Sequence, residues 1–147
     1  MTRTPATLDA LLRGLPSVWT DATEGPNTWS PYIVMGHLIH GERGDWIQRL
    51  SIILEHGVSR TFETFDREAQ FKESAAKPLA ELLDEFAALR QGNLAQLRAL
   101  DLQSAQLELQ GLHPAFGPRH RATAAGHVDG ARFGAYAADH ARDGPAL

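Results

Sequence analysis

The sequence contains no cysteine, which excludes disulfide bonds, thiolate metal ligands and a cysteine nucleophile. A metal ion would therefore have to be bound by histidine, aspartate or glutamate. Lysine is also scarce, and the two lysines and twelve arginines form no basic run. Together with a formal net charge of -4, this composition argues against nucleic acid as the main partner.

Long hydrophobic runs are missing as well. No segment approaches the roughly 20 consecutive apolar residues of a membrane-spanning helix, and the N-terminus lacks the apolar centre of a signal peptide. We therefore expect a cytoplasmic protein that does not bind membranes. The chain has 147 residues, 43% of them hydrophobic, and is long enough for one hydrophobic core, so we expect a single domain over residues 1–147.

Large aliphatic side chains are scarce near the end of the chain. Between Pro118 and Ala146 there is no leucine, isoleucine or methionine, whereas residues 78–100 contain seven leucines. The end of the chain therefore offers little apolar surface to a helical core.

Two segments at the start and in the middle of the chain have the apolar spacing of amphipathic helices. The first helix is predicted over residues 7–20, with a kink or an end at Pro16. A later helix is predicted over residues 78–100, where leucines recur every three or four positions.

Between these two lies the longest predicted helix. Ser30 and Pro31 form a strong start signal, residues 32–55 continue the helix, and Gly57 is expected to end it. Three glycines inside this helix lower its intrinsic stability and indicate close packing or a local bend. Its predicted inner side consists of Ile33, Val34, His37, Leu38, Trp46, Leu50, Ile53 and Leu54.

The connections have no clean period. We expect residues 58–76 to form a long connection with a short helix, and residues 101–118 to form a loop with one turn near Ser104. No β-strand signal is evident. The predicted fold is therefore all-α: a four-helix bundle with a long crossover between helices 2 and 3 and a degenerate fourth helix.

The segment TWSPYIVMGHLIHGERGDW, residues 28–46, holds the residues most suited to chemistry. His37 lies on the apolar side of the helix, and taken alone it fits a core histidine with a hydrogen-bond partner. His40, with Glu42 and Arg43, fits a solvated face. Asp45 fits either a partner for an imidazole or surface charge.

Other titratable residues carry weaker signals. His56 and His113 stand beside Gly57 and Pro114 and fit capping or turn positions. Three carboxylates of the later helix fit a solvated face, namely Glu81, Asp84 and Glu85. No catalytic triad order, phosphate-binding loop or paired-carboxylate pattern is present.

The motifs WSPYIVMGHLIHGE and IILEHG resemble the DinB/YfiT-like superfamily, and FDREAQF, LAELLDEFAALRQGNLAQLRAL and GLHPAFG extend the likeness. The resemblance covers residues 8–117; residues 118–147 depart from it. It implies a four-helix bundle with a divalent metal held by three histidines, one at the position of His37 and two from an HDLxH pattern on the fourth helix. It also implies thiol S-transfer, with mycothiol or bacillithiol, or metal-dependent hydrolysis.

In such a site a divalent ion (Zn, Ni, Mn or Fe) lowers the pKa of a bound water or thiol. This chain lacks HDLxH, so the resemblance implies an impaired enzyme whose small thiol or other small-molecule substrate is not identified. His127 is a candidate replacement ligand, but it lies thirteen positions before His140, which does not recreate the i, i+4 spacing of HDLxH.

The tail fits a fourth helix translated one nucleotide out of frame. Joining the last two bases of each codon to the first base of the next permits VTVRQLLATWTVHDLxHxxQI from Arg119 onward. The two histidines of the pattern then fall at Ala131 and Ala135. The alternative is ordinary divergence, in which the tail is a genuine alanine-rich helix.

A non-catalytic reading stays open beside the enzymatic one. A bundle without a full fourth helix exposes an apolar face, and such a face favours a homodimer or another interaction role.

Overall fold

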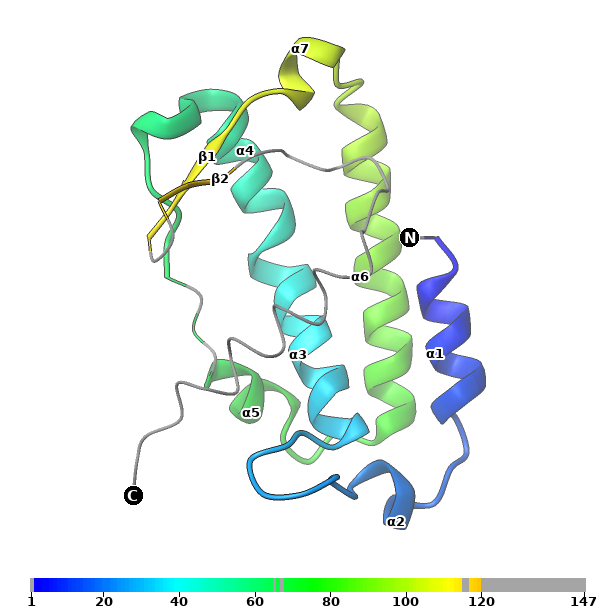
Figure 1. Ribbon diagram of the computed structural model, residues 1–147. Coiled ribbons are helices and arrows are strands. Elements are labelled where there is room, and N and C mark those ends of the chain that lie inside the picture. Colours follow the sequence, from blue (N-terminus) through cyan, green and yellow to red (C-terminus); the bar gives the residue numbers. More distant parts are fainter. Residues whose placement is uncertain (1, 65, 67, 115–116, 120–147) are drawn as a thin grey trace.

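The computed structural model describes residues 2–64, 66, 68–114 and 117–119 (Figure 1). The longer helices are α1 (Thr4–Leu12), α3 (Pro31–Gly44), α4 (Trp46–His56) and α6 (Leu79–Ala99). The shorter elements are α2 (Ser17–Thr20), the 3-10 turn η1 (Gly57–Ser59), α5 (Ala69–Ser74), α7 (Ser104–Leu107), β1 (Gly111–His113) and β2 (Gly117–Arg119). Most of the predicted fourth helix lies outside the described residues.

The long helices run in an order that explains the crossover. α3 and α4 follow one another along one side of α6 and run in the same direction as α6, while α1 packs on α6 and runs the opposite way (Figure 1). Two neighbouring parallel helices need a connection that returns along the bundle. Residues 57–78 make this return, and the predicted short helix within them is confirmed as α5.

The core lies between α3 and α6. Met35 and Ile39 of α3 pack against three buried α6 side chains, Leu82, Leu83 and Phe86. The predicted inner side of the second helix was therefore partly wrong: Val34 is 39% and Trp46 59% exposed. The face turned toward α6 lies one residue further round than the sequence pattern indicated.

Two predicted helices are broken in the structure. The first ends at Leu12, because Gly14 adopts a φ of +81° before the chain reaches Pro16. The second is interrupted at Asp45, directly after Gly44, and resumes as α4. The predicted local bend is thus confirmed. The start at Ser30 is also confirmed, since its hydroxyl accepts a hydrogen bond from the Ile33 amide at 3.3 Å.

The prediction of no β-structure was wrong, because β1 and β2 form a small antiparallel hairpin beside α4. The Phe62 amide donates to the Leu112 carbonyl at 3.0 Å and ties the crossover to β1. A Cβ at Gly111 would lie 2.2 Å from Phe62 Cζ and 2.8 Å from Ile53 Cγ1. Only glycine fits there, and this tertiary contact has no local sequence signal.

Candidate functional site

His37 stands where α3 meets the crossover helix α5. Its side chain is half-buried, and its Nδ1 lies 3.0 Å from Oε1 of Gln70, a residue of α5 that is only 1% exposed. The Trp29 ring lies on the imidazole with centroids 5.0 Å apart and planes inclined by 57°. His37 is therefore an oriented histidine with a defined hydrogen bond at Nδ1, which agrees with the reading of a satisfied histidine and also suits a ligand.

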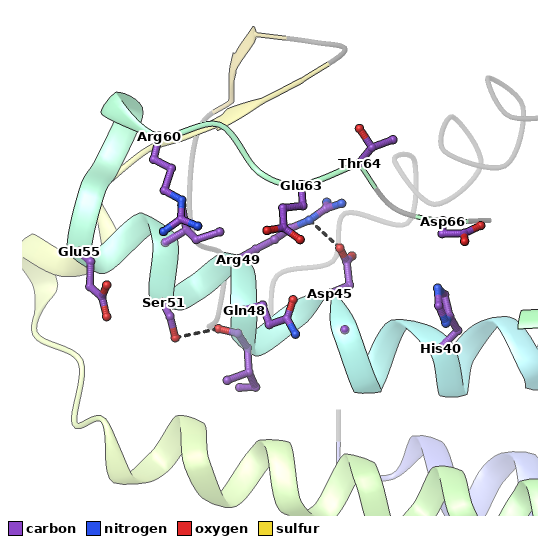
Figure 2. A pocket seen from close by; sticks show the side chains of 13 residues that line it. His40, Asp45, Gln48, Arg49, Ser51, Glu55, Arg60, Glu63, Thr64 and Asp66 are labelled. Carbon is purple, nitrogen blue, oxygen red and sulfur yellow. Dashed lines mark hydrogen bonds and ion pairs between the residues drawn. The ribbon is translucent and has the colours of Figure 1, made fainter. Parts of the chain in front are cut away.

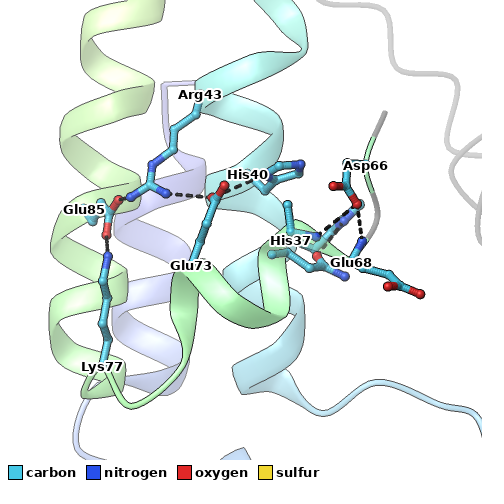
Figure 3. A network of polar contacts seen from close by, with 10 residues as sticks. His37, His40, Arg43, Asp66, Glu68, Glu73, Lys77 and Glu85 are labelled. Atoms are coloured by element: carbon cyan, nitrogen blue, oxygen red, sulfur yellow. Dashed lines mark hydrogen bonds and ion pairs between the residues drawn. The ribbon is translucent and has the colours of Figure 1, made fainter. Parts of the chain in front are cut away.

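His40 belongs to a chain of charged groups that joins α3, α5 and the start of α6 (Figure 3). Its Nδ1 lies 3.2 Å from Glu73 Oε2, which also accepts from Arg43 at 2.7 Å. Arg43 further pairs with Glu85, and Lys77 Nζ donates to Glu85 at 2.9 Å. The prediction that His40 is solvated was wrong, because its side chain is only 14% exposed.

Glu85 carries the clearest electrostatic signature of this network. Burial alone would raise the pKa of its carboxyl, but the hydrogen bond from Lys77 and the charge of Arg43 outweigh burial and hold the pKa below its ordinary value. Glu81 and Asp84 are exposed as predicted, whereas Glu85 is half-buried.

Replacing Glu85 by glutamine should lower the free energy of unfolding by about 1 kcal/mol at pH 7, a modest value because its partners are about one-third exposed. A lowered folded-state pKa stabilises the protein above the unfolded-state pKa of about 4.3, and this stabilisation is lost as the pH falls through the folded-state pKa. The difference between parent and variant should therefore shrink below about pH 4.

Urea unfolding of both proteins at several pH values measures this difference. Glu63→Gln is the matched control, because Glu63 is exposed and has no ion pair within the described ranges. A loss that is the same at pH 7 and under acid would show that the carboxylate charge is not its cause.

Glu42 is buried, contrary to the predicted solvated face. It is 4% exposed, and its carboxylate Oε1 lies 2.6 Å from Arg90 Nη2 of α6. Asn93 Nδ2 donates to the Glu42 backbone oxygen at 2.7 Å and to Oε2 at 3.0 Å. The Arg90 contact is close enough for an ion pair but is not aligned as a hydrogen bond. Glu42 Oε1 and Arg90 Nε thus have no hydrogen-bond partner among the described residues.

Asp45 is not a surface charge, which was one of its two predicted roles. Its carboxylate is buried at the break between α3 and α4 and pairs with Arg49 Nε at 2.5 Å. Burial raises the pKa of this carboxyl, and the charges of Arg49 and His40 offset only part of the effect. Asp45 therefore stabilises the helix break through Arg49.

A pocket of about 470 Å³ lies between α4 and the segment that carries Arg60, Glu63, Thr64 and Asp66 (Figure 2). Its lining carries charges of both signs, among them His40, Asp45, Arg49, Arg60, Glu63 and Asp66. Hydrogen bonds from the backbone amides of Glu68 and Ala69 hold the pKa of Asp66 below its ordinary value. The Asp66 carboxylate thus stabilises the local turn that contains it. His37 is not part of this lining, which makes the pocket a separate polar surface.

The remaining predicted residues are dispersed. His56 ends α4, and its carbonyl accepts from Ser59 Oγ at 2.7 Å, which confirms a capping position. The expected turn position of His113 was wrong, because His113 is the last residue of β1 and its ring meets Phe62 edge-on. Within the described residues, no group of three histidine, aspartate or glutamate side chains is arranged to hold a metal. His127, Ala131 and Ala135 lie outside them.

A family model of the DinB superfamily matches residues 1–129. The chain belongs to the DinB superfamily. Its fold is similar to YfiT from Bacillus subtilis, described as a probable metal-dependent hydrolase with an unusual four-helix bundle topology. The two share 19% sequence identity with a TM-score of 0.67, over 81% of this chain and 67% of that one. No curated protein sequence matches the chain.

The similarity to YfiT confirms the predicted four-helix bundle. Among the described residues, no helix has the length and apolar character needed to cross a membrane. The DinB-like chain also holds one site residue that sequence reasoning missed. Gln70 was overlooked because α5 is too short to show a period, although its motif FDREAQF belongs to the family resemblance.

Proposed function

We propose that this protein derives from a metal-dependent enzyme of the DinB superfamily, a hydrolase or a thiol S-transferase, and that the chain with its present tail is impaired. The observation that carries the proposal is the placement of His37. Its ring is held between Gln70 and Trp29 at the position that the family resemblance assigns to the first metal ligand.

The number of metal ligands in the chain limits the activity that it can have. A catalytic site for a divalent ion of this kind needs three protein ligands and an open position for water or substrate. The described residues contribute one imidazole and no group of three, so they do not fit such a site by themselves. The tail has alanine at 131 and 135, where the shifted reading frame would encode histidine. We therefore derive no reaction step through a metal in this chain.

The test is metal binding by the chain as it stands. We expect titration with Zn²⁺ or Ni²⁺ to give well under one equivalent of tightly held ion, and His37→Ala to change this little. His56→Ala is the matched control, since His56 caps α4 away from His37. One tightly held equivalent that is lost in His37→Ala but kept in His56→Ala would show an intact metal site and overturn the proposed impairment.

A second candidate function, a dimerising interaction protein, is favoured by one surface. Four apolar side chains of α1, α2 and the turn between them are strongly exposed: Leu11 at 62%, Leu15 at 45%, Val18 at 71% and Trp19 at 68%. Exposed apolar clusters of this kind mark interaction sites. Sedimentation equilibrium of the chain and of a Val18→Ser, Trp19→Ser variant tests this candidate: a parent dimer that becomes a monomer in the variant supports it, and a monomeric parent refutes it.

A further inference from the structure

The crossover helix α5 is fixed against α3 at several points. Tyr32 Oη donates to the Ser74 carbonyl at 2.6 Å and also lies 3.0 Å from the Lys77 carbonyl oxygen. A Cβ at Gly36 would lie 2.6 Å from Ser74 Oγ and 3.0 Å from Ser74 Cβ, so the missing side chain allows the two helices to approach closely. These contacts leave α5 little freedom to shift along α3. The side chain of Gln70 is consequently held in place beside His37.

The polar side chain of Gln70 reduces the stability of the fold at this position. It is 1% exposed, and its amide Nε2 is buried with no hydrogen-bond partner in the part of the chain that the structure describes. A buried donor without a partner reduces stability, so an apolar side chain of similar volume would serve packing better. The amide oxygen of Gln70, Oε1, contacts His37 Nδ1 at 3.0 Å. The role of the glutamine is therefore its hydrogen bond with the imidazole of His37.

A carbonyl oxygen can only accept a hydrogen bond, so Gln70 Oε1 requires a proton on Nδ1 of His37. In the neutral ring the lone pair then resides on Nε2. Trp29, at 5.0 Å, limits rotation of the imidazole about its own axis. The hydrogen bond and the ring contact together select one tautomer and one orientation.

We infer that Gln70 is a positioning residue that fixes His37 as the Nδ1–H tautomer and thereby presents Nε2 as the basic nitrogen. The tautomer itself does not depend on a metal. The inference can therefore be tested on the chain as it exists.

The experiment is a long-range ¹H–¹⁵N correlation spectrum of the full ¹⁵N-labelled chain, without metal. It is recorded at about pH 8.5, where a histidine with an ordinary pKa of about 6.5 is neutral. His37→Gln identifies the His37 signals by their loss. We expect a protonated Nδ1 and an unprotonated Nε2 in the parent, a loss of this preference in Gln70→Leu, and its retention in Gln70→Glu, whose carboxylate still accepts. Gln70→Glu also guards against failure of the leucine variant to fold.

An Nε2–H tautomer in the parent, or an unchanged tautomer in a folded Gln70→Leu chain, would overturn the inference.

Discussion

Replacing Arg90 by methionine should lower the free energy of unfolding by about 3–5 kcal/mol. The reason is that the substitution leaves the Glu42 carboxylate buried between α3 and α6 without its counter-charge. Glu42 is 4% exposed, and the side chain of Arg90 is 16% exposed, so water replaces little of the lost interaction. Asn93 still donates to Glu42 in the variant, but a neutral amide does not neutralise a charge.

Two further variants separate the ion pair from simple loss of packing. Arg98→Met removes an exposed arginine from the last turn of the same helix and should change stability by less than about 0.5 kcal/mol. The double variant Glu42→Leu, Arg90→Met removes both charges and should recover most of the loss, because an apolar pair replaces a buried ionic one at little cost.

Urea unfolding followed by circular dichroism measures all three variants. The double variant keeps the prediction testable if Arg90→Met alone does not fold. An Arg90→Met effect below about 1 kcal/mol would contradict the view of Glu42 and Arg90 as a tightly coupled buried pair.

Restoring the shifted reading frame after Arg119 should produce the other large effect. The printed tail should give a broad thermal transition at low temperature, because it replaces leucine, valine and isoleucine by alanine and glycine. Each large aliphatic side chain contributes about 1.5–3 kcal/mol on burial. Several such residues in a restored fourth helix should raise the melting temperature by at least about 10 °C and sharpen the transition.

The coding DNA decides whether a frameshift can explain the tail. For the shifted frame to encode both histidines, the codons of Ala131 and Ala135 must be GCA, and that of Arg132 must be CGA to encode the intervening aspartate. Other third bases at these positions would refute the frameshift and favour ordinary divergence. A sharp melt of the printed chain at high temperature would contradict the expected loss of core.

Local sequence signals were sufficient where local chemistry decides the structure. A Ser-Pro pair before an apolar helical period starts a helix, and Ser30 and Pro31 do so at the start of α3. The leucines after Pro78 predict both ends of α6 to within one residue. The tertiary partners were not predictable in this way. Glu42 read as a solvated residue because Arg90, which allows its burial, lies on a different helix.

The candidate site also contains one residue that the sequence predicts and one that it does not. The position of His37 follows from the family resemblance, and its place on the helix follows from the period of α3. Its partner Gln70 is brought to it by the crossover, 33 residues further along the chain. No spacing rule predicts such a contact. The hairpin escaped prediction for a related reason, since Gly111 is required by Phe62 and Ile53 rather than by its neighbours in sequence.

Under the proposed function, His37 keeps its ligand position while the other two ligands have been lost with the reading frame. The most direct measurement is the metal content of three purified proteins by elemental mass spectrometry: the printed chain, the frame-restored chain, and the frame-restored chain with His37→Ala. We expect about one divalent ion per chain only in the frame-restored chain with His37 intact. A full equivalent in the printed chain, or none in the restored one, would contradict it.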